Sequence, residues 1–323
     1  MSAVVGPGID PALEAPQATG EGASDAVTFS FADVGADCFG VARVGLSRGA
    51  DGAWQASGLG VLFSGREPIA VRAAGGIDVA ATGWDAARAA GVASDVVAPG
   101  AVWSVSFDSE DGRSGFRATF TAVSAAGVVG AEHPVARTGG MQGYEHLCRV
   151  TGTARVRGGE RRLACLGQRG HSWGRPDWDR VASVRTVAAW FAEDHGVSLV
   201  AVRPAKAGDH GAEEVAATLW GAGEEDDELT GPPASGSASA EHPAAAFAVL
   251  EPRLSATYDA QGRQRRASFE LFEHEDAFPR RGAGDVLCGT SLDLGRLQLD
   301  CAFFAWEMEG RSGVGRFDVL RRA

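Results

Sequence analysis

Short runs in which hydrophobic and polar residues alternate dominate this chain. Clear examples lie at 54–63, 102–107, 115–123, 253–258 and 266–272. Alternation with a period of two is typical of strands that are buried on one face. Turns rich in aspartate and glycine separate these runs, and the turn at 108–112 predicts a β-hairpin.

The second half of the chain repeats this pattern. Runs at 185–191 and 197–202 predict another hairpin, although 185–191 could also form a short helix. Further strands are predicted within 297–308 and 315–320. Many short strands without a long helical period indicate sandwiches or barrels. The predicted fold class is therefore all-β, with two tandem antiparallel β-barrels or sandwiches and few short helices.

The length of 323 residues also favours two domains, because a domain usually has about 100–200 residues. Residues 1–25 contain several prolines and glycines and predict a flexible leader. We expect an N-terminal barrel at 26–165 and a C-terminal barrel at 166–323. The second barrel would carry a flexible acidic loop at 221–246.

Composition and charge narrow the range of partners and locations. The net charge is −12 and no basic cluster stands out, which argues against a nucleic-acid partner. The five cysteines are widely spaced and predict neither a disulfide framework nor a metal site. The chain shows no signal peptide and no apolar run of the roughly 18–20 residues that a membrane span requires. We expect a soluble, cytoplasmic protein, and the oligomeric state stays open.

The segment 167–179 concentrates reactive side chains at mid-sequence. It contains Arg169, His171, Trp173, Trp178, Asp177 and Asp179. His171 could exchange protons near neutral pH because an ordinary histidine has a pKa of about 6.5. A turn between the two residues could bring Asp177 back to the imidazole and form an acid/base pair. Alternatively, His171 binds a backbone carbonyl and the tryptophans fill a core.

A second group of candidates lies at 142–150, a predicted strand. Alternation places Tyr144 and His146 on one face and Glu145 on the other. The Tyr144 face could line a cavity shared with the central segment, and Glu145 or His146 could be a second acid/base group. These residues could equally form ordinary cross-strand pairs.

Other catalytic motifs are absent from the sequence. It has no Gly-x-Ser-x-Gly elbow, Walker loop, His-Glu-x-x-His motif or dinucleotide fingerprint. Elbow-type hydrolases, NTPases, zinc proteases and Rossmann dehydrogenases therefore each lack their main sequence signal.

The run Arg-Gly-His-Ser-Trp-Gly at 169–174 resembles a known motif. It is similar to the Asp-His-Asn/Ser-Trp-Gly motif of two-domain, lipocalin-like proteins, which include the hydroxyneurosporene synthase (carotenoid 1,2-hydratase) and AttH-like families. The ending at 309–318 is similar to the glycine-rich final strand of the same group. His171, Trp173 and Gly174 match the motif, whereas Gly170 stands at the position of its acid. The scarcity of lysine, asparagine and isoleucine further indicates a GC-rich genome and an actinobacterial branch.

The resemblance implies two lipocalin-like barrels, a hydrophobic cavity and proton chemistry on isoprenoids or related metabolites without a cofactor. If the acid that Gly170 replaces supplies the catalytic proton in relatives, this protein must use Asp177, Asp179 or Glu145 instead, or it has lost the chemistry. The leading hypothesis is a hydratase, lyase or isomerase that binds a lipophilic small molecule between or inside the barrels. Its predicted catalytic residues are His171, Asp177 and Glu145, and its predicted ligand contacts are Tyr144, Arg169, Trp173, Trp178 and Asp179.

Two other hypotheses stay open. A non-catalytic carrier or sensor with the same fold would have a deep apolar pocket, with His171 and the carboxylates pointing away from it. A structural or partner-binding β protein could dock through the acidic run at 224–228. That third hypothesis predicts no cavity of ligand size.

Overall fold

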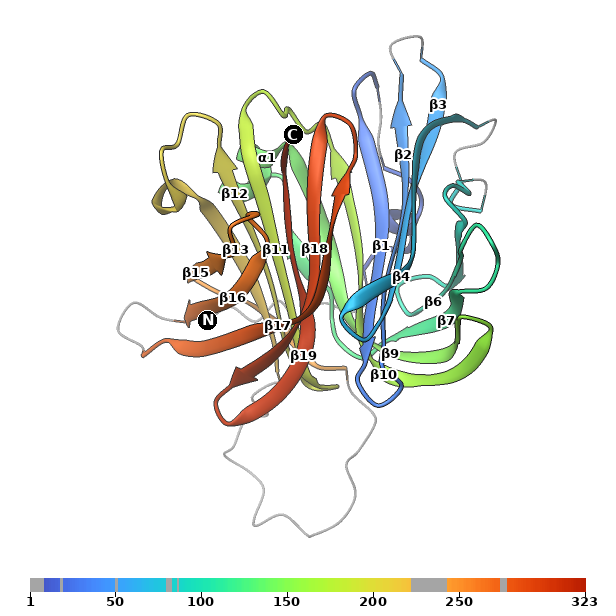
Figure 1. Cartoon of the computed structure of the whole chain (residues 1–323). Coiled ribbons are helices and arrows are strands. Elements are labelled where there is room, and N and C mark those ends of the chain that lie inside the picture. The colour runs from blue at the N-terminus through green and yellow to red at the C-terminus, as the bar shows by residue number, and fades with distance from the viewer. Residues whose placement is uncertain are drawn as a thin grey trace.

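The computed structural model describes residues 9–17, 20–49, 52–79, 83–85, 87–221, 243–273 and 278–323. Two large antiparallel sheets contain most of them, and each sheet curls into a half-barrel (Figure 1). The all-β prediction with two tandem β domains is confirmed.

The first sheet has the strand order β4-β3-β2-β1-β10-β9-β7-β6-β5, and β8 pairs with β9 beside this path. Its strands are β1 (Ser24–Asp33), β2 (Cys38–Arg48), β3 (Trp54–Ser64), β4 (Glu67–Asp78), β5 (Val92–Ala98), β6 (Val102–Asp108), β7 (Gly115–Ala122), β8 (Gly127–Val129), β9 (Met141–Val156) and β10 (Gly159–Gly174). Strands β6 and β7 pair across the predicted turn at 108–112.

The second sheet has the order β14-β13-β12-β11-β19-β18-β17-β16-β15. Its strands are β11 (Val181–Ala192), β12 (His195–Pro204), β13 (Glu214–Gly221), β14 (Ala245–Ala248), β15 (Glu251–Tyr258), β16 (Gln264–Phe272), β17 (Arg280–Asp293), β18 (Leu297–Met308) and β19 (Arg311–Arg322). Strands β11 and β12 pair along their length, so 185–191 is a strand and not a helix.

The described helices are short. They are the 3-10 helices η1 (Pro11–Glu14) and η2 (His210–Ala212) and the α-helix α1 (Pro134–Gly139). Pro134 begins α1, and Gly140 ends it with a positive φ of 69°, a conformation that glycine adopts without a steric cost. The side chain of Val135 packs with Val181 and Val202 of the second sheet, so α1 lies against the second half-barrel.

The predicted flexible leader is wrong where the structure describes it. Residues 11–14 form η1, and Glu14 is buried. Strand β1 begins at Ser24, inside the predicted leader. Polar partners inside the first half-barrel explain the burial of Glu14, and the local composition gave no sign of them. Residues 1–8 and 18–19 lie outside the described residues.

Two other predicted boundaries also differ from the structure. Strand β10 continues past residue 165 and pairs with β1 and β9 as far as Gly174, so the change of sheet falls between Gly174 and Val181. In the predicted acidic loop, Ala245–Ala248 forms β14 and pairs with β13. The acidic run at 224–228 lies outside the described residues.

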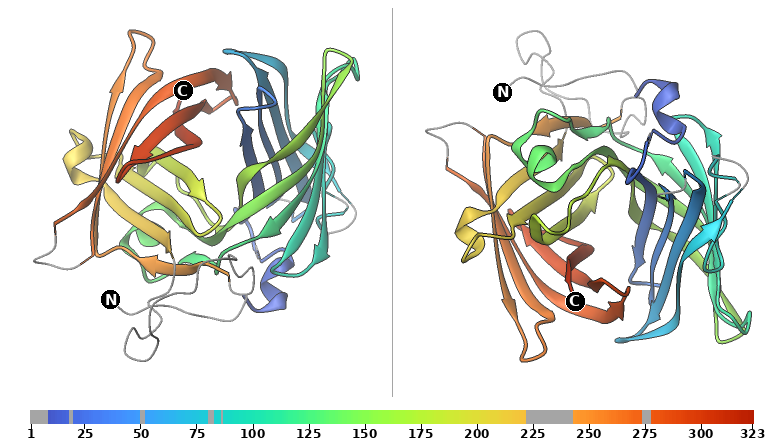
Figure 2. Two further views of the ribbon diagram at one scale, coloured as in Figure 1. Left: turned by 90° about the horizontal axis from the view of Figure 1, so that it is seen from below. Right: turned by 90° about the horizontal axis from the view of Figure 1, so that it is seen from above.

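Each half-barrel encloses its own hydrophobic core. The first core contains Phe29, Trp103 and Phe116, and the second contains Phe269 and Trp306. Figure 2 shows the two curved sheets side by side, the first in blue and green and the second in yellow, orange and red. Right-handed strand twist gives such sheets their curl.

The half-barrels pack tightly against each other around Phe303. There the rings of Phe39 and Phe63, from the first sheet, lie 5.5 and 5.9 Å from the ring of Phe303. Trp190 and Leu147 belong to the same buried cluster. Next to this cluster, residues of both sheets line a cavity, and Leu59 and Ala188 belong to both the cluster and the cavity lining.

Candidate functional site

Strands β9 and β10 carry different chemistry on their two faces. In their register Tyr144 lies opposite His171, and Glu145 lies opposite Gly170. Successive side chains of a strand point to opposite faces. Tyr144, His171 and Arg169 therefore face the interior of the first half-barrel, whereas Glu145 faces the second. The predicted alternation of Tyr144 and Glu145 is confirmed.

His171 is closed inside the first half-barrel. Its Nε2 lies 2.7 Å from Oδ1 of Asp25, and its Nδ1 lies 3.3 Å from the Tyr144 hydroxyl. The side chains of His171 and Asp25 both have an exposed fraction of 0%. The rings of Trp84 and Trp173 pack on the imidazole at 5.4 and 5.0 Å. This imidazole is held by partners on several sides, as a structural histidine would be.

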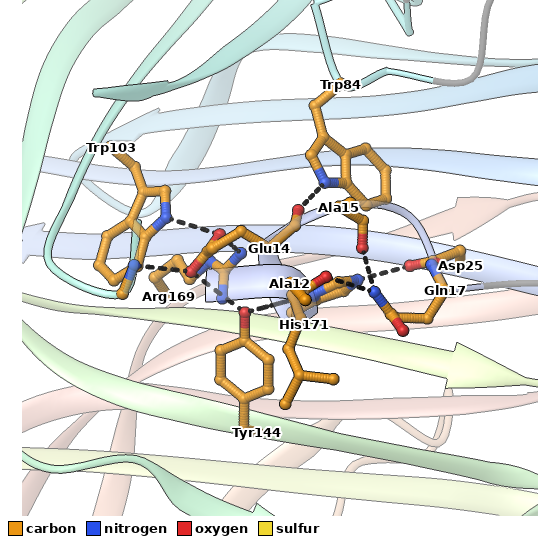
Figure 3. Close-up of polar contacts among 12 residues, drawn as sticks. Ala12, Glu14, Ala15, Gln17, Asp25, Trp84, Trp103, Tyr144, Arg169 and His171 are labelled. Atoms are coloured by element: carbon orange, nitrogen blue, oxygen red, sulfur yellow. Dashed lines mark hydrogen bonds and ion pairs between the residues drawn. The ribbon is translucent and has the colours of Figure 1, made fainter. Parts of the chain in front are cut away.

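The carboxylate of Glu14 fills the space beside this histidine (Figure 3). It accepts hydrogen bonds from Trp103 Nε1 at 3.0 Å, Arg169 Nη2 at 2.8 Å and the Tyr144 hydroxyl at 3.2 Å. Trp84 Nε1 donates to the main-chain oxygen of Glu14 at 2.7 Å. The N-terminal segment thus occupies the interior of the first half-barrel at this point.

Arg169 and His146 complete this buried cluster. The guanidinium of Arg169 lies 4.7 Å from the Trp103 ring and 4.9 Å from the Tyr144 ring. Nδ1 of His146 lies 3.1 Å from the main-chain oxygen of Ser124. Burial lowers the pKa of His146 to about 4 and raises the pKa of Tyr144. His146 is therefore neutral at neutral pH, and Tyr144 stays protonated.

The expected pairing of His171 with Asp177 is not what the structure shows. Asp25 is the carboxylate that binds His171. Asp177 is exposed and accepts the main-chain N–H of Asp179 at 3.0 Å. The carboxylate of Asp179 lies 3.3 Å from Arg322 Nη1 at the surface. The strand continues as far as Gly174, so the segment does not turn back toward the imidazole as the sequence suggested.

The two tryptophans of the central segment lie apart. Trp173 packs on His171 and, with a ring distance of 6.1 Å, on Tyr144. Trp178 instead lines the cavity between the sheets and packs near Val135. The structure therefore brings Tyr144, Arg169, His171 and Trp173 together and separates them from Trp178.

The cavity between the half-barrels has a volume of about 780 Å³. Ligand pockets commonly have volumes of about 300–1,000 Å³, so this space could hold a small organic molecule. Apolar side chains from both sheets line much of it, including Leu59, Val184, Val200 and Leu320. The hypothesis of a structural or partner-binding β protein predicted no cavity of ligand size, so this cavity argues against it.

Two cross-strand rows of residues line the cavity, one from each sheet. The row in the first sheet follows the register of β9, β10, β1, β2, β3 and β4. It consists of Glu145, Gly170, Thr28, Arg43, Leu59 and Ala73. The row in the second sheet consists of Thr218, Ser198, Ala188 and Arg316. All these residues line the cavity, and polar groups thus face each other across it.

Glu145 connects the two rows. Its carboxyl group forms a hydrogen bond with the hydroxyl of Ser198 and another with the side chain of Gln168. Gln168 is oriented by Trp190, whose Nε1 donates to its Oε1 at 3.1 Å. Burial raises the pKa of Glu145, although Ser198, Gln168 and Arg316 act in the opposite direction. A raised pKa favours the protonated acid.

The carboxyl group of Glu145 lies beside Gly170. A Cβ at Gly170 would lie 3.4 Å from both Cγ and Oε1 of Glu145. The Glu145 side chain therefore borders the space that a side chain at position 170 would enter. This places a carboxyl group beside the position of the missing motif acid, on the neighbouring strand.

Two arginines also line the cavity, with different surroundings. Arg316 forms an ion pair with Asp318 on the same strand. Arg43 lies across the cavity on β2, where burial lowers its pKa and nearby Arg316 lowers it further. Asp25 acts on Arg43 in the opposite direction.

Four charged residues near the histidine and the cavity were not among the predicted site residues. Glu14 and Asp25 lay in the predicted leader, Arg43 lay in a segment without a recognisable motif, and Arg316 lay in the motif-like ending at 309–318 without a predicted role. The alternation of residues 26–31 could have extended the first strand toward Asp25. Nothing local to Glu14 predicts its contacts, because Trp103, Tyr144 and Arg169 are distant in sequence.

The described part of the chain has no metal-binding cluster and no membrane-spanning helix. No group of three or more His, Cys, Asp or Glu side chains there could hold a metal ion. No helix among those residues is long and apolar enough to cross a membrane. The five cysteines are free thiols.

Fold and cavity together define a protein with two lipocalin-like domains and a ligand-sized space between them. Residues 10–225 match a family described as a domain of unknown function, DUF7064. The match spans more than half of the chain, so the chain belongs to this family. None of the curated proteins compared with the chain matches it in sequence.

Solved structures with this fold include three informative examples. An AttH-like protein from Nitrosomonas europaea has a TM-score of 0.64 at 11% identity, covering 99% of this chain and 98% of that one. Kievitone hydratase from Nectria haematococca has a TM-score of 0.60 at 11% identity, with coverages of 99% and 95%. CghA with Sch210972 has a TM-score of 0.53 at 12% identity, with coverages of 93% and 89%. At these identities the likeness concerns the fold.

Proposed function

We propose that this protein binds a lipophilic small molecule in the cavity between its half-barrels and hydrates, cyclises or isomerises it by proton transfer. Glu145 would be the general acid. The observation that carries this proposal is the position of its carboxyl group in the cavity, beside Gly170. Burial in apolar surroundings keeps such an acid protonated at a higher pH than usual. The presence of a hydratase among proteins of this fold supports the same reaction class.

The proposed reaction begins when the Glu145 O–H transfers its proton to one carbon of a substrate double bond. The π electrons form the new C–H bond, and positive charge develops on the neighbouring carbon. Water can then add to that carbon and return a proton to the carboxylate, which gives net hydration. If another double bond of the substrate attacks instead, loss of a proton to Glu145 completes a cyclisation. Either sequence regenerates the acid.

His171 has a different place in this proposal from the one that the sequence suggested. Its side chain lies on the opposite face of the sheet and is bound to Asp25 and Tyr144. It would therefore hold β10 in position, with Gly170 toward the cavity. Of the three predicted catalytic residues, Glu145 lines the cavity, and Asp177 does not. His171 belongs to the lining, but its side chain is 0% exposed and bound on the opposite face of the sheet.

The non-catalytic carrier or sensor is the alternative proposal. The apolar lining favours it, as do the side chains of His171 and Asp177, which are bound to Asp25 and to the main-chain N–H of Asp179. A carrier would bind the same lipophilic ligand, but the ligand would leave unchanged. Glu145 would then serve only as a hydrogen-bonding group.

A product assay distinguishes the two proposals. Wild type and Glu145→Gln would be incubated with kievitone and with unsaturated isoprenoid alcohols in isotopically labelled water. Mass spectrometry would detect addition of water or isomerisation. We expect Glu145→Gln to lose about 10²–10⁴-fold in rate, the usual contribution of a general acid. Wild-type rate should also fall as pH rises through the raised pKa of Glu145, because the proton donor is lost.

Glu193→Gln is a matched control, since Glu193 is a surface carboxylate bound to Arg149. Binding of the neutral dye N-phenylnaphthylamine would verify that the cavity is intact in each variant. Equal rates for Glu145→Gln and wild type would overturn the role of Glu145. Binding without any conversion by the wild type would favour the carrier.

A further inference from the structure

Arg43 is a charged group of the cavity that the proposed reaction does not use. Its guanidinium has no hydrogen bond or ion pair with any residue that the structure describes. Arg316 in the same cavity, by contrast, is paired with Asp318. Buried or partly buried charges are normally paired, so the isolated guanidinium needs a physical explanation.

Ser57 lies next to Arg43 and adds a second donor. Arg43 lies on β2 and Ser57 on β3, where Ser57 pairs with Gly45. A Cβ at Gly45 would lie 2.6 Å from Ser57 Oγ and 2.9 Å from Arg43 Nη1. Both donor atoms, together with the main-chain oxygen of Asp25 at 3.3 Å, therefore lie directly over Gly45, where a side chain would collide with them. Ser57 Oγ also lacks a hydrogen-bond partner within the described ranges.

The other charges around the cavity do not neutralise this pair of donors. Asp318 is bound to Arg316. Asp293 is exposed and accepts the Gly295 N–H at 2.8 Å. Asp25 attracts Arg43 from the opposite face of β1, where it is bound to His171. Glu145 lies at one end of the cross-strand row of the first sheet that also contains Arg43. Its carboxyl group is uncharged when it is protonated, and it then does not neutralise Arg43.

We propose that Arg43 and Ser57 form an oxyanion-binding subsite above Gly45, and that the ligand is an amphipathic acid whose carboxylate binds there. A guanidinium and a hydroxyl both donate to carboxylate oxygens, and charged hydrogen bonds of this kind are among the stronger ones in proteins. The inference rests on the proposed function, because it concerns the substrate class of the same cavity.

The cross-strand row sets the size of this ligand. Arg43 and Glu145 are separated by Thr28 and Gly170, which gives three strand spacings. At about 4.8 Å per strand, their Cα atoms lie roughly 14 Å apart. A carboxylate bound to Arg43 would therefore leave a chain of several carbons to extend past Thr28 toward Glu145. The reacting double bond of the ligand would therefore lie several carbons away from the ligand's own carboxylate.

Binding of cis-parinaric acid and its methyl ester tests the subsite. Both carry the same fluorescent polyene, and only the acid carries a charge near neutral pH. We expect wild type to bind the acid roughly 10–100-fold more tightly than the ester. Arg43→Gln should reduce the affinity for the acid by that factor and leave the affinity for the ester within about twofold. Gly45→Ala should give the same pattern, because its methyl group would collide with Ser57 Oγ and Arg43 Nη1 and displace both donors.

Arg281→Gln is the matched control, since Arg281 is an exposed arginine paired with Glu270 on the outer surface. It should leave both affinities unchanged. Equal wild-type affinity for acid and ester would overturn the subsite while leaving the proposed cavity intact. Loss of both affinities in Arg43→Gln, with the fold unchanged, would also overturn it. Absence of binding by either probe would overturn the ligand cavity and the subsite together.

Discussion

One face of β9 and β10, the inner face, lies toward the interior of the first half-barrel, and the other, the outer face, lies toward the second half-barrel. The two faces differ in how closely their polar groups are enclosed. On the inner face, Glu14 and His171 are enclosed by partners from several strands. On the outer face, Glu145 and Arg43 border a space of about 780 Å³. Polar groups are abundant on both faces, so their number alone does not locate a site. Access to a ligand-sized space distinguishes them.

This comparison changes the meaning of the histidine motif. His171 is the titratable group that attracts attention in the sequence, yet its side chain has an exposed fraction of 0%. Gly170, which looked like the loss of an acid, lies on the cavity face opposite Glu145. The motif therefore marks a strand whose neighbour carries a carboxyl group on the cavity face.

The inner face should respond most strongly in stability. Arg169→Met removes the cation from a pair in which Glu14 is 5% exposed and Arg169 is 0% exposed. An uncompensated buried carboxylate typically costs about 3–5 kcal/mol. We expect urea denaturation to show a loss of that size in the free energy of unfolding.

The double variant Arg169→Met with Glu14→Gln provides the matched comparison. It removes both charges, and we expect it to recover part of the loss. A single variant within about 1 kcal/mol of wild type would mean that the inner cluster contributes little to the fold. The contrast between the two faces would then fail.

The sequence predicted the general architecture and only part of the site. Alternating runs and Asp-Gly turns predicted strands and hairpins such as β6–β7, because these signals are local. The alternation along β9 also predicted that Tyr144 and Glu145 face opposite sides. Contacts of Glu14 and Asp25 could not be predicted, since they join the N-terminus to strands far along the chain. The resemblance implied a hydrophobic cavity, but its position and lining could not be predicted, because they depend on how the two sheets pack.

His146 should make the inner face sensitive to acid. Burial lowers its pKa from 6.5 to about 4, so the unfolded chain binds a proton in that range and the folded chain does not. Stability is fully present above pH 6.5 and falls as the pH drops toward 4. The expected loss is about 1.4 kcal/mol per pH unit, roughly 3 kcal/mol in total. Denaturation at a series of pH values would measure it.

His146→Gln should flatten this dependence, because glutamine can donate to the Ser124 oxygen but does not titrate. The same slope in wild type and His146→Gln would show that other groups govern the acid sensitivity.

The smallest expected effect is on the cavity face. The hydroxyl of Ser198 lowers the pKa of Glu145 by hydrogen bonding, which favours the charged form. Ser198→Ala should therefore raise that pKa and move the alkaline limb of the activity profile upward by about one pH unit. The rate well below that limb should change little, since the acid is already protonated there. Ser183→Ala, at a buried serine outside the cavity, should not move the limb. A limb that moves downward in Ser198→Ala would contradict Glu145 as the proton donor, because only loss of a group that favours the protonated acid could cause it.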